Sequence, residues 1–441
     1  MEKRSCYMYR ETARLLIYNN LQKDSILIQL SNIIKEYETK TIDKQLAKVK
    51  VFEQMHNLLE IATTYGFNNN LWQNYLTYLL ITTETPFSIT CEKNGAVEGS
   101  VNLLVKQDFD AFMKLFHYDF SWLQEELGVD CFSIIANYKA VPKLETTYNK
   151  NVSSKVVLLS DKLSKAETVE EFYELVTGFY KDYGVGLLGL NKAFRVDKED
   201  GKVVLVPITN TEIVRFDDLI GYDSQKKKLK ENTEAFLHGK KANNVLMFGD
   251  SGTGKSTSMK ALLNEYYDDG LRIIEIYKHQ FEDLSKVISM IKNRNYKFII
   301  YMDDLSFEEF EIEYKYLKAV IEGGLEIKPK NVLIYATSNR RHLIRETWSD
   351  REDVRAEELH HSDTMQEKLS LVARFGVTIH FLRPDKKQFN EIVINLAKKY
   401  PQITLTESEL TLKANQWELS HGGMSGRCAE QFINFLLGQC E

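Results

Sequence analysis

The stretch Gly249-Asp-Ser-Gly-Thr-Gly254-Lys255-Ser256 decides the fold of the second half of this sequence. It follows the apolar run Asn244 to Phe248, which has the length of a buried strand, and it leads into the amphipathic segment Ser256 to Tyr266. Glycines at these positions let the backbone curl so that its N–H groups and the start of the helix face phosphate oxygens. The sequence therefore predicts a P-loop, a phosphate-binding turn between a strand and a helix.

The same loop supplies residues that we expect to hold a nucleotide and its metal ion. Lys255 is expected to reach the β- and γ-phosphates of ATP, and the Ser256 hydroxyl to ligate Mg²⁺. A lysine in the first turn of a helix opposes the helix dipole, which favours a phosphate partner at this place. The predicted cofactor-binding residues of the loop are Gly249, Asp250, Ser251, Gly252, Thr253, Gly254, Lys255, Ser256 and Thr257.

Two carboxylates follow a second apolar run about fifty residues later. The run Phe298 to Met302 ends in Asp303 and Asp304, and α/β folds bind their ligands at the carboxyl ends of such buried strands. We expect Asp303 to hold Mg²⁺ through its water shell. Asp304, which alternation turns the other way, is expected to orient or deprotonate an attacking water.

With these two motifs in place, the sequence resembles AAA+ ATPases over about Phe216 to Gln431. The resemblance implies that Ile220 and Gly221 lie beside the adenine. It also implies that Asn339, at the polar end of the apolar run that starts at Val332, touches the γ-phosphate or the attacking water. Lys255, Asp303, Asp304 and Asn339 are thereby the catalytic candidates of one chain.

Two arginines extend the resemblance. Arg374, in the run Ser370 to Gly376, matches the position of the arginine finger that a neighbouring subunit inserts, where a guanidinium stabilises charge on the transferred phosphoryl group. Arg427 resembles the sensor-2 arginine of the lid and is expected to contact the nucleotide. Because Arg374 would act on a neighbour's site, we expect a homo-oligomer, for which a ring is one arrangement.

A narrower resemblance rests on the runs Glu231 to Phe236, Asp303 to Glu308 and Tyr335 to His342. They resemble an uncharacterised bacterial family of AAA+-type ATP-binding proteins, known only as a domain of unknown function. The chain departs from most active AAA+ members at Asp304, where those carry glutamate. Since aspartate is one methylene shorter, Glu308 or Glu309 is the alternative residue for positioning the water.

The fold class predicted is α/β: a P-loop NTPase of the AAA+ type, with a parallel sheet core and a C-terminal helical lid, preceded by a mainly α-helical N-terminal domain. Apolar residues recur at helical spacing in the first third of the chain and give way to short apolar runs alternating with amphipathic segments. The expected core strands are Asn244 to Phe248, Arg272 to Tyr277, Lys297 to Met302, Val332 to Thr337 and Val377 to Phe381.

This change in the spacing of apolar residues along the chain predicts four segments. Residues 1–183 are expected to form the helical N-terminal domain, 184–210 a β-hairpin connector, 211–384 the nucleotide-binding core and 385–441 the lid. The hairpin is expected to pair the β-rich runs Gly184 to Val196 and Lys202 to Pro207 around the turn sequence Asp197 to Gly201.

Composition narrows the classes of partner and the compartment. Among 441 residues, 57 Lys+Arg stand against 63 Asp+Glu, so the net charge of −6 does not favour nucleic acid as the partner, although a local basic patch would be compatible with it. The 5 cysteines include no pair at CxxC spacing and are expected to be reduced thiols. No uncharged apolar run approaches about 18 residues. We expect a cytoplasmic protein that does not contact membranes.

The function predicted is hydrolysis of ATP to ADP and phosphate, driving a conformational change in a protein partner that binds the N-terminal domain. The N-terminal domain has no motif that names this partner. One alternative is a switch or scaffold that binds ATP and hydrolyses it slowly, which the pair Asp303-Asp304 favours. Another is a DNA-transaction ATPase, because Ala373-Arg374-Phe375 also resembles the equivalent box of replication initiators and their loaders.

Overall fold

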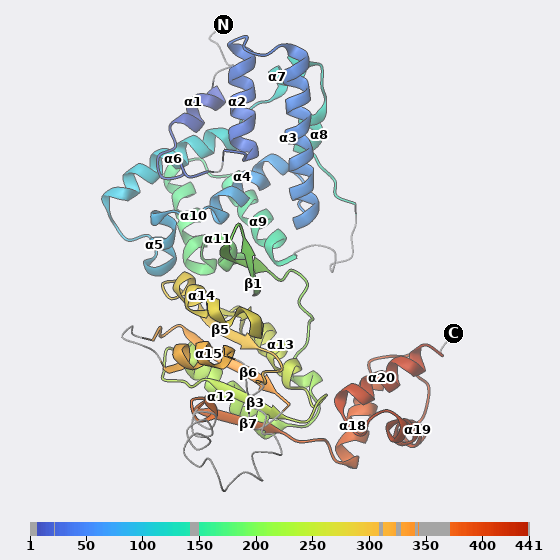
Figure 1. Ribbon diagram of the computed structural model, residues 1–441. Coiled ribbons are helices and arrows are strands. Elements are labelled where there is room, and N and C mark those ends of the chain that lie inside the picture. The colour runs from blue at the N-terminus through green and yellow to red at the C-terminus, as the bar shows by residue number, and fades with distance from the viewer. Residues whose placement is uncertain are drawn as a thin grey trace. The chain divides into compact units, whose positions relative to one another are not determined.

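The computed structural model of the chain describes residues 7–21, 23–141, 150–307, 312–322, 328–339, 343 and 371–439. The chain divides into two compact units, Met1–Asn191 and Lys192–Glu441, which appear in blue to green and in green to red in Figure 1. No helix in these ranges has both the length and the apolar character needed to cross a bilayer. Of the cysteines, Cys91, Cys131 and Cys428 are free thiols.

The first unit is built from helices alone in the part that is described. Its apolar side chains recur at helical spacing and meet in one buried cluster, which includes Leu27, Phe109 and Tyr180. Its helices are α1 (Tyr7–Ala13), α2 (Ile26–Glu38), α3 (Lys44–Tyr65), α4 (Leu71–Thr82), α5 (Pro86–Asn94), α6 (Ser100–Phe116), α7 (Ser121–Leu127), α8 (Cys131–Ala136), α9 (Lys150–Leu163), α10 (Val169–Tyr183) and α11 (Gly186–Leu190). The prediction of a helical N-terminal domain is confirmed.

The strand expected over Gly184 to Val196 is wrong in its first half. Residues Gly186–Leu190 form the short helix α11, and the strand begins only at Ala193. The spacing of the apolar residues in this run does not distinguish a short helix from a strand. Val185 and Leu190 are buried in the helical cluster of the first unit, and this packing decides the helical form.

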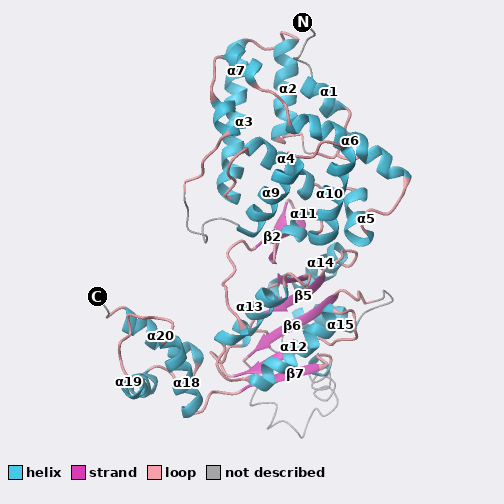
Figure 2. Ribbon diagram, turned by 180° about the vertical axis from the view of Figure 1, so that it is seen from behind, coloured by secondary structure: helices cyan, strands magenta, loops and turns pink. Residues whose placement is uncertain are grey.

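The second unit contains a sheet of seven strands, drawn as magenta arrows in Figure 2. The strands are β1 (Ala193–Glu199), β2 (Lys202–Pro207), β3 (Val245–Gly249), β4 (Leu271–Glu275), β5 (Lys297–Met302), β6 (Val332–Ser338) and β7 (Val377–Phe381). Their order is β2-β1-β4-β5-β6-β3-β7. The five strands β3, β4, β5, β6 and β7 pair in parallel, as predicted, and each lies within one or two residues of its expected bounds.

The hairpin β1–β2 extends this sheet at one edge. Its two strands are antiparallel with Glu199 opposite Lys202, so that Asp200 and Gly201 form a two-residue turn. Both turn residues have positive φ, 49° and 75°, as the favoured hairpin turn requires. Strand β1 also pairs in parallel with β4, which makes the hairpin part of the sheet.

Helices accompany the sheet and then form the end of the chain (Figure 1). Those of the core are η2 (Phe216–Asp218), α12 (Asp223–Leu237), α13 (Lys255–Tyr266), η3 (Lys278–Asp283), α14 (Leu284–Ile291) and α15 (Glu313–Glu322). The lid consists of α18 (Lys386–Ala397), α19 (Glu407–Ser420) and α20 (Gly426–Leu437), which share a small apolar core of their own. A parallel sheet with a P-loop, a helical lid and a helical N-terminal unit confirms the predicted fold class.

Candidate functional site

Two glycines shape the loop that joins β3 to α13. Gly249 has φ +136°, and a Cβ atom there would lie 2.0 Å from the backbone oxygen of Phe381 on the neighbouring strand. Gly254 has φ +91° and directly precedes the helix; a Cβ atom there would lie 2.5 Å from the side chain of Leu219. Only glycine combines these dihedral angles with this close packing, so the loop sequence fixes the curl of the backbone.

The ammonium group of Lys255 is held inside this loop. Lys255 is 7% exposed, and its Nζ donates to the carbonyl oxygens of Gly249 at 2.9 Å and Asp250 at 2.7 Å and to Oδ1 of Asn339 at 3.1 Å. Burial lowers the pKa of Lys255, and the carboxylates of Asp304 and Asp250 oppose this shift. The result is a cation fixed against the glycine-rich loop at the start of α13, a position suited to a phosphate.

Asp303 lies at the carboxyl end of β5, next to the start of α13. Its Oδ1 accepts hydrogen bonds from three hydroxyl groups, those of Ser256 at 2.8 Å, Tyr301 at 2.6 Å and Thr337 at 2.5 Å. Burial by itself would raise the pKa of Asp303, but these hydroxyl groups outweigh it and lower the pKa below the ordinary 3.8. The side chain is therefore a carboxylate at neutral pH.

Asp304 and Asn339 form a second pair at the same edge of the sheet. The amide of Asn339 donates through Nδ2 to Oδ1 of Asp304 at 2.7 Å while its own Oδ1 accepts from Lys255. The backbone of Asp304 has φ +48°, a left-handed conformation that is uncommon outside glycine, and its N–H donates to the Thr337 hydroxyl at 2.9 Å. The amide of Asn339 thus links the P-loop lysine to the second carboxylate.

A cavity of about 430 Å³ opens beside this group. It is lined by Phe248, Gly249, Asp250, Asn339 and His380, and the rings of Phe248 and His380 stack with their centroids 4.6 Å apart. Predicted site residues from the loop and from the end of β6 therefore border one hollow. Here a small ligand could meet both Asp250 and Asn339.

The lid also contacts the loop. The N–H of Arg427 donates to the carbonyl of Gly252 at 3.4 Å, and repulsion from its guanidinium is among the smaller causes that lower the pKa of Lys255, after burial. Ile220 packs against the apolar core of the lid, and Gly221 follows it with φ +75°. The structure therefore places these three predicted cofactor-binding residues where the lid meets the core.

Arg374 forms an ion pair with a residue outside this group. Its Nη2 forms an ion pair with Oε1 of Glu322 at 2.5 Å, and both side chains are about one-third exposed, at 36% and 33%.

Among the predicted catalytic residues, Glu308 and Glu309 lie outside the described residues.

Sequence reasoning missed two residues that contact Asp303. Tyr301 and Thr337 are read as interior positions of apolar strands, since each sits among residues that are buried by hydrophobicity. Tyr301 is 8% exposed and Thr337 is 1% exposed. A hydroxyl residue within two positions of the end of each strand was the available signal, but strand pairing was needed to bring both to Asp303.

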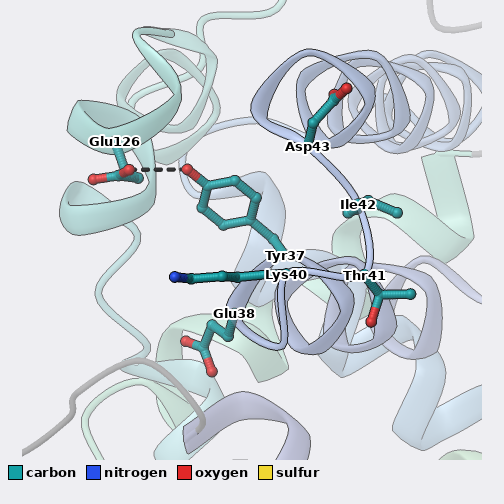
Figure 3. Close-up of a pocket in the computed structure, with 7 residues that line it drawn as sticks. All are labelled: Tyr37, Glu38, Lys40, Thr41, Ile42, Asp43 and Glu126. Carbon is teal, nitrogen blue, oxygen red and sulfur yellow. Dashed lines mark hydrogen bonds between the residues drawn. The ribbon is translucent and has the colours of Figure 1, made fainter.

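A larger hollow, of about 700 Å³, lies in the helical unit and contains none of the predicted site residues. Its lining residues are drawn in Figure 3, where the hydroxyl of Tyr37 donates to Glu126 at 2.9 Å. This hydrogen bond is the largest cause that raises the pKa of Tyr37. Of its charged lining residues, Glu38, Asp43 and Glu126 are acidic and Lys40 is basic.

The three runs that carry the narrower resemblance meet in the core. Asn232 donates through Nδ2 to the hydroxyl of Tyr335 at 2.9 Å, and Thr233 shares a hydrogen bond of 2.9 Å with the same hydroxyl. Thr337, two residues further along β6, holds Asp303. Strand β6 therefore contacts both other runs, α12 through Tyr335 and Asp303 through Thr337.

Residues 190–440 match the family described as "Protein of unknown function (DUF815)". The chain belongs to this family. The matched part of this DUF815 protein contains all of the sheet, the loop and the lid, and only the last residues of the helical unit. No curated protein matches the chain.

Solved structures similar to this DUF815 protein include RuvB of Thermotoga maritima, described as a Holliday junction branch migration motor. The likeness has a TM-score of 0.32 at 14% sequence identity and covers 51% of this chain and 72% of that one. A mutant of the same RuvB gives a TM-score of 0.33 at 14% identity with the same coverage.

Proposed function

We propose that this DUF815 protein binds ATP with Mg²⁺ and hydrolyses it to ADP and phosphate. The observation that carries the proposal is the chain of contacts from the loop through Lys255 and Asn339 to Asp304. It brings together a buried cation from the start of α13, an amide from the end of β6 and a carboxylate from the end of β5. Phosphoryl transfer needs this combination of charge stabilisation and water positioning.

The residues present also fit a magnesium ion. The hydroxyl of Ser256 and the carboxylate of Asp303 are hard oxygen donors 2.8 Å apart, and proteins hold Mg²⁺ with one or two carboxylates together with substrate phosphates. When bound, the ion would neutralise developing charge on the phosphate oxygens. Asp303 supports this role because the hydroxyl groups around it keep its pKa low in spite of burial, so that it carries its charge at neutral pH.

Hydrolysis further requires a group that orients water near the γ-phosphate. We assign this role to Asp304, with Glu308 as the alternative. Asn339 lies between Lys255 and Asp304, at 3.1 Å and 2.7 Å from their side-chain atoms, and is therefore well placed to contact both the phosphate and the water. Lys255 would stabilise the negative charge that develops on the transferred group.

Replacement of Lys255 tests the proposal directly. Lys255→Ala should weaken binding of a fluorescent ATP analogue by about ten- to hundredfold, because a charge-assisted contact contributes about 1.5–3 kcal/mol, and it should abolish hydrolysis. The matched control is Lys260→Ala on the same helix, whose ammonium pairs with Glu212 at the surface. Equal ATP binding by Lys255→Ala and wild-type protein would contradict the proposal.

A slowly hydrolysing ATP switch is the second candidate, and the geometry of Asp304 favours it. Its Oδ1 already accepts from Asn339 at 2.7 Å, and its side chain is one methylene shorter than the glutamate of active AAA+ members. Clear ATP binding with a turnover equal to that of Lys255→Ala would favour the switch. Turnover well above that of the variant would favour the ATPase.

We further propose that Arg374 serves a neighbouring copy of the chain and that the helical unit binds a protein partner. The support for the first is that Arg374 pairs with Glu322 rather than with the loop of its own chain. Its exposed fraction of 36% leaves it accessible at the surface. A homo-oligomer would then complete each site, and a ring is one form that it could take.

A further inference from the structure

Three hydroxyl groups converge on a single oxygen of Asp303, and only one of them belongs to the P-loop. Ser256 comes from the start of α13, Tyr301 from β5 itself and Thr337 from the neighbouring strand β6. A carboxylate oxygen has about two lone pairs to offer. The three donors together therefore leave Asp303 little freedom to rotate.

Thr337 also contacts the backbone that follows Asp303. Its hydroxyl proton points to Oδ1 of Asp303 at 2.5 Å, while its lone pair accepts the backbone N–H of Asp304 at 2.9 Å. Its own carbonyl accepts the N–H of Leu305 at 2.7 Å. Thr337 thus contacts both the carboxylate of Asp303 and the left-handed backbone of Asp304.

Tyr301 differs from an ordinary core tyrosine by the placement of its hydroxyl. The residue is 8% exposed, and its hydroxyl lies 2.6 Å from Oδ1 of Asp303, which is two residues further along, just past the end of β5. The long side chain of Tyr301 therefore reaches from the strand to the carboxylate at its end.

We propose that Thr337 and Tyr301 are positioning residues of the magnesium site: they hold the Asp303 carboxylate beside the Ser256 hydroxyl, so that these two groups would bind the metal together. The inference rests on the proposed function. It goes further by assigning the orientation of Asp303 to residues outside the P-loop and the acidic pair. Groups that orient a metal ligand in this way typically change metal affinity about 10- to 100-fold when they are removed.

The experiment measures binding, so that it does not depend on turnover. A fluorescent ATP analogue is titrated at fixed MgCl₂ concentrations and also in EDTA, which gives the affinity without metal and the MgCl₂ concentration for half-maximal enhancement. Thr337→Val removes the hydroxyl at nearly constant volume, Thr337→Ser keeps it, and Tyr301→Phe removes the second hydroxyl.

We expect Thr337→Val to raise the half-maximal MgCl₂ concentration about tenfold, with affinity in EDTA unchanged and with Thr337→Ser close to wild type. Tyr301→Phe should act in the same direction. If both hydroxyl-deleted variants keep the wild-type MgCl₂ dependence, the inference is wrong. If Thr337→Val does not fold, Tyr301→Phe carries the test alone.

Failure of the proposed function would appear differently in the same titration. Wild-type protein would then bind the analogue no better than Lys255→Ala, in EDTA or in MgCl₂. Binding by wild-type protein that depends on Lys255 and on MgCl₂, together with wild-type behaviour of Thr337→Val and Tyr301→Phe, would overturn only the inference about these two residues.

Discussion

At the scale of single residues, Gly249 is constrained by the strand beside it as well as by its own dihedral angle. It lies opposite Phe381 in the parallel pairing of β3 with β7, and a Cβ atom would meet the Phe381 carbonyl oxygen at 2.0 Å. A methyl group there must displace backbone. We expect Gly249→Ala to lower the free energy of unfolding by about 2–5 kcal/mol, from left-handed strain and overpacking together, as measured by urea denaturation.

The variant Gly270→Ala separates the cost of left-handed strain from the cost of overpacking. Gly270 has φ +91° with no atom within 4 Å of an added Cβ, so the substitution adds strain without a clash. Its expected cost is about 1–2 kcal/mol. An equal loss of stability in both variants would show that the contact with Phe381 relaxes freely, contrary to our expectation.

The residues of the site differ in how far the sequence could predict them. Lys255, Ser256 and Asp303 are predicted by motifs whose spacing along the chain is fixed, and the structure brings them together. Thr337 is different, because its role depends on the pairing of β5 with β6. No local pattern encodes which strand lies beside which, so its contact with Asp303 was out of reach.

At the scale of elements, the lid is fastened to the core by a salt bridge between Asp218 of η2 and Lys399, which follows α18. The hydrogen bond from Lys399 is the largest cause that lowers the pKa of Asp218 below 3.8. A lowered folded-state pKa contributes stability above the unfolded pKa, and this contribution is lost as the pH falls through the folded-state value. The salt bridge should therefore act at neutral pH and fade in acid.

We expect Asp218→Asn to lower the free energy of unfolding by about 0.2–1 kcal/mol at pH 7, the range for exposed ion pairs. The difference from wild type should shrink as the pH falls below about 3.8 and also at high salt. Urea denaturation across this pH range measures it. Asp217→Asn removes the adjacent exposed carboxylate as a control, and a difference for Asp218→Asn that is independent of pH would contradict the assignment.

Some elements could be predicted from their own sequence, whereas the form of others depends on the elements that they pack against. The apolar run Lys297–Met302 forms β5 with the predicted bounds, because a short apolar run between turn signals suits a strand buried on both faces. The run Gly186–Leu190 is equally apolar but forms a helix. Its form depends on burial among the helices of the first unit, which sequence spacing does not reveal.

At the scale of the whole molecule, nearly all the residues that we propose for ATP hydrolysis lie together in the second unit, but the proposed arginine finger forms an ion pair with Glu322. The guanidinium of Arg374 pairs with Glu322 at 2.5 Å. Within one chain, Lys255 is the cation that lies in the loop. If Arg374 acts on a second copy, the activity of each site must depend on assembly.

ATP hydrolysis per subunit should therefore rise with protein concentration in the wild type. Arg374→Ala should bind ATP normally and show low activity that does not rise, with a loss on the order of 10³-fold at the highest concentration, because an arginine finger contributes about that much. Arg195→Ala, which removes another surface arginine from its ion pair with Glu275, should retain the rise. Glu322→Gln, which weakens the pair that holds Arg374, should shift the rise to lower concentration. Wild-type turnover by folded, ATP-bound Arg374→Ala would exclude this residue as the finger, whereas a flat wild-type profile would mean that each site is complete within one chain or awaits a different partner.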